Sequence, residues 1–300
     1  VYGGLRVNYV WNKYEGNITN ISANINGTNY PLHEYFGNTA NALETQAKAL
    51  RAQAQTITDP TTVAKLTAGA DQAEAGAKAM RKQQGEVQDK HLESTQTGWG
   101  VTPIIGVDVK LGKWNLASKF EFNTHLNIQN DTKRDDTGMF KHGVNTPNDI
   151  PALLTLGAQY EITPEVRVMT GWHHYFDKSA KMANDKQKLL KGDTNEFLLG
   201  AEWDVTDKIL VSAGTQLTRY GLGNGAYLND MSFVTSSYSI GFGAKFQVAK
   251  NMHVNVAYFW TNYEKFNKTT EATLGVAQVV NTDEFTRTNK AFGVGLDITF

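Results

Sequence analysis

Apolar and polar residues alternate along much of this chain with a period of two, and this pattern limits the fold more than any other sequence feature. The clearest example lies between residues 114 and 128. One set of positions is apolar: Trp114, Leu116, Phe120, Phe122, Leu126 and Ile128. The other set is polar: Lys119, Glu121, Asn123, His125 and Asn127. Because successive strand side chains point to opposite faces, we predict one two-faced strand, longer than the about 9–11 residues that a tilted strand needs to cross a membrane.

The same alternation predicts ten strands in all. The other nine are expected at residues 5–11, 99–111, 154–162, 166–176, 197–205, 209–217, 238–248, 252–260 and 292–300. The last places Phe292, Val294, Leu296, Ile298 and Phe300 on one face. A chain that ends on such a strand with an aromatic residue is typical of an outer-membrane β-barrel, in which one face of each strand meets lipid and the other meets the lumen.

The predicted connections between these strands alternate between two kinds. Tight turns are expected at 112–113, 163–165, 206–207 and 249–251, and long polar connections at 129–149, 177–195, 221–231 and 267–284. Short periplasmic turns that alternate with longer extracellular loops are how outer-membrane barrels are built. The predicted fold class is therefore all-β, a transmembrane antiparallel β-barrel formed as a single domain over residues 1–300.

Composition narrows the class of protein. The formal charge is −1 and no cysteine occurs, which argues against nucleic acid as a partner and excludes disulfides and cysteine-based metal sites. Mean hydropathy is −0.42, which does not exclude a barrel because half of each strand faces a polar interior. Val1 begins within a strand without a signal-peptide pattern, so we expect the start of the natural protein to be missing.

Residues 38–92 depart from the β pattern and are rich in Ala, Gln and Lys. The apolar positions of a first helix are Leu43, Ala47, Leu50, Ala54 and Ile57. Those of a second are Val63, Leu66, Ala70, Ala73, Ala77, Met80 and Val87. Asp59-Pro60 separates them, and proline favours the first turn of a helix. We predict a helical hairpin, packed along two apolar stripes and, by the alternation of connections, extracellular.

Few residues suggest reactive chemistry. Glu121 and His125 fall on the polar face of the same predicted strand, but a polar lumen wall explains them better than acid–base catalysis. His173 and His174 are adjacent on a strand and point to opposite faces, so they cannot chelate one ion. The charge run at 131–136 is interpreted as a solvated loop. The sequence has no glycine-rich phosphate loop or nucleophile elbow, so we predict no enzyme activity, cofactor or metal.

With the strands in place, the sequence resembles the FadL-type outer-membrane transporters of long-chain fatty acids and other hydrophobic compounds. The stretch from Tyr2 to Tyr9 is similar to the family strand that leads into a long helical loop. Thr97-Gly-Trp-Gly100 resembles the start of the returning strand, and Lys119 to Thr124 resembles the next one. Asn148-Asp-Ile-Pro151, followed by Leu154 to Tyr160, is similar to a descending strand of the family.

The resemblance implies a fourteen-stranded barrel with an N-terminal hatch, of which this chain holds the last ten strands. It implies a basic pocket residue near the helical loop, for which Lys13 is the candidate. Glu121 and His125 are further lumenal candidates. An extracellular apolar groove is expected to use Leu43, Leu50, Val63, Leu66 and Met80.

The predicted function is passive transport of hydrophobic small molecules, such as long-chain fatty acids or hydrocarbons, across the outer membrane of a Gram-negative bacterium. Outer-membrane lipid is an expected partner, and lipopolysaccharide is a further candidate. The alternatives are a structural or adhesin-type barrel that binds another protein and, behind it, a barrel-embedded hydrolase. Bound lipid would favour transport, and tight protein partners would favour the adhesin.

Overall fold

The computed structural model describes residues 1–25, 27–229, 233–274 and 277–299, which form two compact units. The first comprises Val1–Val10, Thr97–Gln129 and Asn145–Phe300, and the second comprises Trp11–Gln96 and Asn130–Val144. Three strands pass from one unit into the other: β1 (Tyr2–Ile18), β4 (Lys90–Leu111) and β6 (Asn127–Asp135). The predicted helical region therefore lies inside a larger unit than its own 38–92 range.

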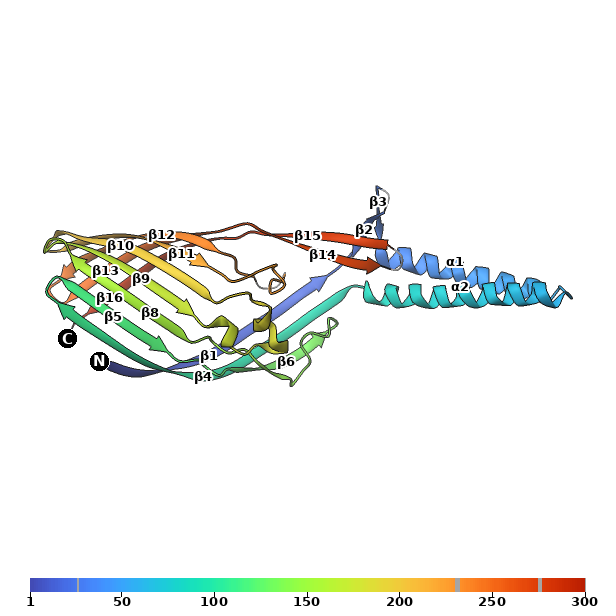
Figure 1. Cartoon of the computed structure of the whole chain (residues 1–300), viewed down its shortest axis with the longest axis horizontal. Helices are drawn as coiled ribbons and strands as arrows, with labels where there is room; N and C mark the ends of the chain where they lie inside the picture. The colour runs from blue at the N-terminus through green and yellow to red at the C-terminus, as the bar shows by residue number, and fades with distance from the viewer. Residues whose placement is uncertain (26, 230–232, 275–276, 300) are drawn as a thin grey trace. The chain divides into compact units, whose positions relative to one another are not determined.

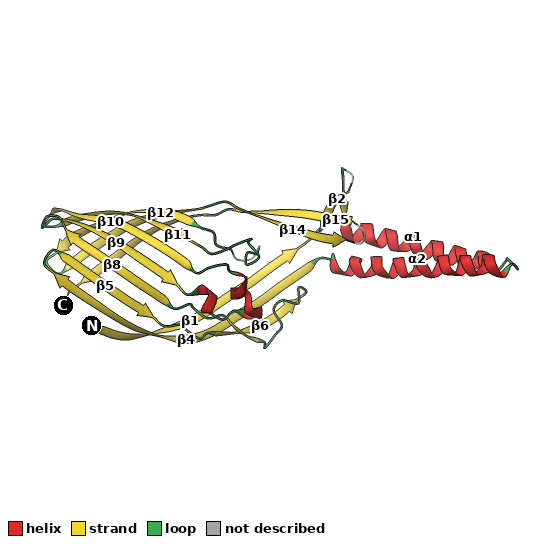
Figure 2. Ribbon diagram, viewed as in Figure 1, coloured by secondary structure: helices red, strands yellow, loops and turns green. Residues whose placement is uncertain are grey.

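The first unit is built around a tilted antiparallel sheet (Figures 1 and 2). After β4, its neighbouring strands are in order β5 (Trp114–Glu121), β8 (Leu153–Glu161), β9 (Val166–Tyr175), β10 (Thr194–Thr206), β11 (Ile209–Arg219), β12 (Ser237–Ala249), β13 (Met252–Tyr263) and β16 (Thr288–Ile298). With β1, which pairs with β4, these are the ten predicted strands. The predicted terminal aromatic, Phe300, lies outside the described residues.

Tight turns join these strands in pairs at one end of the sheet, where Figure 1 also shows both chain ends. Gly112 has a φ of +59° in the turn between β4 and β5, a conformation that glycine adopts without steric cost. Long connections occupy the other end, so the predicted alternation of short and long connections is confirmed. Among the described residues β16 does not pair with β1, and the sheet is open rather than a closed barrel.

The single strand predicted over residues 114–128 is wrong, because β5 ends at Glu121 and β6 begins at Asn127. The intervening chain makes an isolated bridge between Thr124 and Ile150. It also lies very close to β4: a Cβ added to Gly100 would stand 2.7 Å from the carbonyl oxygen of His125. Glycine at this point of β4 therefore permits the close backbone approach that interrupts the strand.

The long connection expected at 267–284 is instead a β-hairpin of β14 (Phe266–Leu274) and β15 (Ala277–Phe285). Threonine favours the strand conformation, so the Thr-rich sequence suits a hairpin. The segment was interpreted as a loop because it is polar. At the base, Phe266 pairs with Phe285, which is buried with Leu190, Leu222 and Leu228 from two other long connections. The remaining connections hold β7 (Asn145–Pro147) and the short 3-10 helices η1 (Asp177–Ser179) and η2 (Ala183–Leu189).

The second unit contains the two helices α1 (Leu32–Ala54) and α2 (Pro60–Glu86), and a small hairpin of β2 (Ser22–Ile25) and β3 (Thr28–Pro31). α1 begins before residue 38 and α2 ends before residue 92. The last residues of the predicted 38–92 range belong to β4. Asp59 caps α2 by accepting a hydrogen bond from the Thr62 amide at 2.9 Å. The residues buried along the two helices are Gly37, Ala40, Ala47, Ala70, Ala73 and Ala77. No helix in the described part of the chain is both long and apolar enough to cross a membrane.

Candidate functional site

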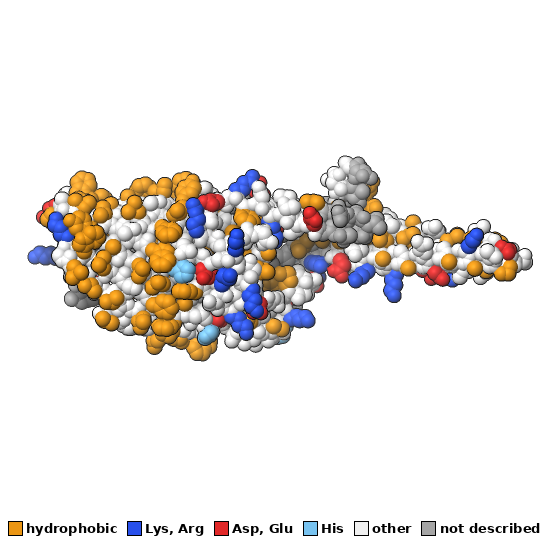
Figure 3. Space-filling model, in the orientation of Figure 1, with side chains coloured by type: hydrophobic (Ala, Val, Ile, Leu, Met, Phe, Trp, Pro, Cys, Tyr) orange, Lys and Arg blue, Asp and Glu red, His pale blue; other side chains and the backbone are white. Residues whose placement is uncertain are grey.

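The sheet of the first unit has two chemically different faces, and β10 shows this most clearly. Phe197, Leu199 and Trp203 are 51%, 61% and 51% exposed on its outer face. Leu198 and Glu202 alternate with them and are only partly exposed on the inner face. Figure 3 shows apolar side chains spread over the outer surface of these strands, with charged side chains gathered toward the long connections. Large apolar groups thus point away from the protein interior.

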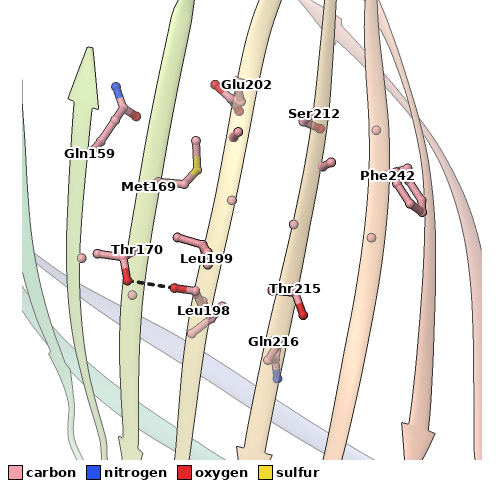
Figure 4. Close-up of a pocket in the computed structure, with 18 of the residues that line it drawn as sticks. Gln159, Met169, Thr170, Leu198, Leu199, Glu202, Ser212, Thr215, Gln216 and Phe242 are labelled. Carbon is pink, nitrogen blue, oxygen red and sulfur yellow. Dashed lines mark hydrogen bonds between the residues drawn. The ribbon is translucent and has the colours of Figure 1, made fainter. Parts of the chain in front are cut away.

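The inner face is lined by glycines at the middle of the strands. In the strand register Gly157 faces Gly171, and Gly200, Gly214 and Gly241 are consecutive partners on β10, β11 and β12. The missing side chains leave a hollow of about 580 Å³. The larger inner-face residues that border this glycine hollow are Asn115, Gln159, Met169, Leu198, Glu202, Ser212, Gln216 and Phe259. Several of them, including Met169, Leu198 and Ser212, are labelled in Figure 4.

A hydrogen-bonded carboxylate lies beside the hollow, toward the long connections. Glu196 on β10 accepts hydrogen bonds from Gln216 Nε2 at 2.8 Å and Tyr175 Oη at 3.1 Å. His173 Nδ1 lies 3.0 Å and Thr218 Oγ1 3.2 Å from its oxygens. Just beyond β11, burial raises the pKa of Tyr220 to about 12, and the charge of Glu196 adds to this effect. The Glu196 carboxylate is therefore a fixed and well-satisfied anion on the inner face.

On the tight-turn side, Glu202 at the border of the hollow belongs to an ion-pair cluster. Arg167 Nε lies 3.2 Å from Glu202 and its Nη1 lies 2.7 Å from Asp204. The arginine side chain is 20% exposed. Among the residues that border the hollow, Glu202 is the single charged one. The described residues that border the hollow are therefore neutral, apart from the negative Glu202.

The sequence-predicted lumenal residues Glu121 and His125 occupy different environments. Glu121 is 6% exposed at the end of β5, and its carboxylate pairs with Arg6 and Lys119, each at 2.7 Å. His125 follows the strand, has an 88% exposed side chain, and lies 3.0 Å from Asp149. The two residues are thus not neighbours on one strand, and neither borders the glycine hollow. Their role in ligand binding stays a prediction.

The other predicted site residues lie in the second unit. Lys13 is exposed on β1 and its Nζ lies 2.6 Å from Glu15. Leu50 packs against Ala47, Ala70 and Ala73 between the helices. The predicted groove residues Leu43, Leu50, Val63, Leu66 and Met80 are all partly buried. Part of their apolar surface therefore holds α1 against α2, and ligand binding by them stays a prediction.

The paired histidines bind different partners, as adjacent strand residues must. His173 lies against Glu196 on the inner face, whereas His174 Nδ1 lies 2.9 Å from Asn195. Within the described ranges, no group of three His, Cys, Asp or Glu residues is arranged to hold a metal ion.

No protein-family profile matches the sequence, and no curated protein matches it either. Solved structures do match. A Pseudomonas aeruginosa FadL homologue aligns with a TM-score of 0.54 and 14% identity, covering 70% of this chain and 55% of the homologue. The toluene transporters TodX of Pseudomonas putida and TbuX of Ralstonia pickettii each align with a TM-score of 0.43 and 11% identity. The TodX alignment covers 70% of this chain and 54% of TodX. The TbuX alignment covers 71% of this chain and 52% of TbuX.

The fold of this chain is therefore of the FadL type, as its alignment with the Pseudomonas aeruginosa homologue establishes. This confirms, at the level of the fold, the resemblance seen in the sequence. The chain spans about half the length of the solved structures that it matches.

Sequence reasoning missed the residues that gather around the hollow. Gly157, Gly171, Gly200 and Gly214 are spread over four strands, and only the register between strands brings them together. Sequence reasoning missed Glu196 for the same reason, because the four residues that hydrogen-bond to its carboxylate lie on the neighbouring strands β9 and β11. A usable signal was present: glycine recurs in the middle of successive two-faced segments, always in the inward set.

Proposed function

We propose that this chain forms part of the wall of an outer-membrane β-barrel that carries hydrophobic small molecules, such as fatty acids or hydrocarbons, across the outer membrane of a Gram-negative bacterium. The observation that carries the proposal is the contrast between the two faces of the sheet. An outward apolar surface needs a lipid environment, because exposing such large continuous apolar patches to water is unfavourable. The inward hollow offers an apolar molecule a desolvated place on its path.

The outer face supports the membrane part of the proposal. Its exposed side chains include rings near the strand ends, such as Trp114, Trp203 and Tyr238. Rings with one apolar and one polar end suit the boundary between lipid and water. We place the tight turns on the periplasmic side and the long connections, including the α1–α2 segment, on the extracellular side.

The glycine hollow supports the transport part. Binding there needs no chemical step, and affinity rises with the apolar area removed from water by roughly 25 cal/mol per Å². The Pseudomonas aeruginosa FadL homologue shares this general fold by alignment, which supports such a path.

A substitution that fills the glycine hollow with a larger side chain tests the proposal. Gly157→Leu is expected to weaken binding of an apolar fluorescent probe to the detergent-purified chain, because a Cβ at Gly157 meets only the Thr170 carbonyl oxygen, at 3.9 Å. Gly293→Leu is the matched control, since Gly293 also lies on the sheet but does not border the hollow. Equal probe binding by both variants and the unmodified chain would contradict the proposed path. Mass spectrometry of co-purified molecules separates this function from the adhesin alternative, which predicts bound protein and no apolar ligand.

A further inference from the structure

The amide of Gln216 is held in one orientation at the border of the glycine hollow. Its nitrogen donates to Glu196 at 2.8 Å and to Thr218 Oγ1 at 3.2 Å. A carboxylate can only accept hydrogen bonds, so the group beside Glu196 must be the nitrogen. Figure 4 shows this nitrogen at the lower end of the Gln216 side chain. The carbonyl oxygen has no hydrogen-bond partner among the described residues, and it remains as an acceptor for a ligand.

Other residues hold Glu196 in place, and Glu196 in turn fixes the orientation of the Gln216 amide. His173, Tyr175 and Thr218 also bond to Glu196, so the carboxylate that fixes the amide is itself fixed. Rotating the Gln216 amide would bring its oxygen against the carboxylate and break two hydrogen bonds. A pre-oriented acceptor of this kind favours a ligand that carries an O–H or N–H donor.

The charges near the hollow disfavour a carboxylate ligand. Glu202 borders the hollow, Glu196 lies beside it, and Arg167 is already paired with two acids. Lys245, on the inner face of β12 beyond Gly243, makes no ion pair with a described residue, and it does not border the hollow. An anion in the hollow would therefore lose its hydration next to two carboxylates.

The shape of the hollow favours a flat apolar group. Its floor is the backbone of Gly157, Gly171, Gly200 and Gly214, with the Met169 side chain over Gly200 and the Leu198 side chain over Gly171. Met169 and Leu198 stand on this floor, and a thioether makes favourable contacts with aromatic rings.

We infer that the hollow binds uncharged aromatic molecules that carry a hydroxyl or amino donor, with Gln216 Oε1 as the acceptor and Glu196 as the residue that positions it. This inference rests on the proposed function and narrows its ligand to the phenol class. It distinguishes such molecules both from plain hydrocarbons and from carboxylic acids.

Three probes that differ in one group test this inference: para-cresol, para-xylene and para-toluate. Their binding is measured on the full chain in lipid nanodiscs, for the unmodified protein, Gln216→Met and Gln247→Met. Gln247 is an inner-face glutamine of β12 that does not border the hollow, so its variant is the matched control. Comparison between proteins in the same lipid cancels the partition of each probe into the membrane.

The expected result is that para-cresol binds about tenfold more weakly to Gln216→Met than to the unmodified chain, while para-xylene is unchanged. The control variant is expected to bind all probes like the unmodified chain, and para-toluate is expected to bind most weakly. Loss of para-cresol binding in Glu196→Leu as well, again with para-xylene retained, supports the positioning role of Glu196.

Other results overturn the inference in distinct ways. Equal affinity for para-cresol in Gln216→Met and the unmodified chain rejects donor recognition but leaves the apolar path intact. Tight binding of para-toluate that is lost in Lys245→Met shows an anion site instead. Failure of all three probes to bind rejects the hollow as a ligand site, and with it the proposed function.

Discussion

Gly98 of β4 lies so close to Asn127 that a Cβ on the glycine would stand 2.5 Å from the Asn127 carbonyl oxygen. Real Cβ atoms do not approach a backbone oxygen this closely, so one of the two strands would have to move. The contact explains why the chain after β5 can fold back onto β4 as β6.

We expect Gly98→Ala to destabilise the sheet by about 1–3 kcal/mol, the usual cost of overpacking. Urea unfolding in detergent, followed by tryptophan fluorescence, measures this cost. Gly293→Ala is the control, because nothing lies within 4 Å of its added Cβ. Equal stability of the two variants would contradict the close approach of β4 and β6.

The seam between α1 and α2 is expected to reject larger side chains. Ala70 is 0% exposed and packs with Ala47, Ala73 and Leu50. Ala70→Leu should therefore destabilise the hairpin by about 1–3 kcal/mol, whereas Ala75→Leu, at an exposed position of the same helix, should not. Amide hydrogen exchange over residues 32–86 in the full chain measures this loss of hairpin stability. Unchanged exchange in Ala70→Leu would show that the helices are not packed along this seam.

Removing the Glu196 acceptor is expected to destabilise the sheet, because Tyr175, Gln216 and Thr218 lose their partner. Each unsatisfied buried donor costs about 1–3 kcal/mol. Glu196→Leu should thus be less stable than Glu196→Gln, which keeps an acceptor oxygen, in the same urea titration. If the leucine variant were as stable as the glutamine variant, the network would not be intact in solution.

A pH dependence is expected from Asp177 in η1, outside the strands. Burial raises its pKa above 3.8, and the neighbouring charge of Asp193 adds to the rise. The folded protein then binds a proton more readily than the unfolded chain, so the contribution of this group is present below pH 3.8 and is lost as pH rises through the raised pKa.

Asp177→Asn should therefore stabilise the protein at neutral pH, since an amide oxygen can still accept the Thr194 amide hydrogen bond, which is 2.9 Å long. The advantage of the variant should shrink as pH falls toward 3.8. Melting temperatures of both proteins across this pH range test the sign. A stability difference that does not change with pH would reject the account of Asp177.

Local alternation was sufficient to predict the strands, because the side-chain period of two is visible in each segment alone. Trp114 and Leu116 could be assigned to one face without knowledge of their neighbours. The tight turns were predictable for the same reason, since glycine at position 112 and proline at position 164 act locally. The break after Glu121 was not predictable, because it depends on glycines of β4 that are more than twenty residues distant.

The helical pair was recognised from its repeat, since Ala47, Ala70 and Ala73 follow heptad spacing. The hairpin at 266–285 was missed because its polar sequence resembles a loop, and its anchor, Phe285, is buried by residues from other connections. The hollow was missed because it is a property of register: Gly157 and Gly171 are opposite each other only once β8 and β9 are paired.

The most direct test of the central claim is the lipid exposure of consecutive residues of β10. The chain has no cysteine, so single cysteines can be placed from residue 197 to residue 203 and spin-labelled in bilayers. The two-faced sheet predicts high oxygen accessibility at Phe197, Leu199 and Trp203, and low values at Leu198, Gly200 and Glu202. Equal accessibility at all positions, or a protein that stays dissolved without lipid or detergent, would contradict the account.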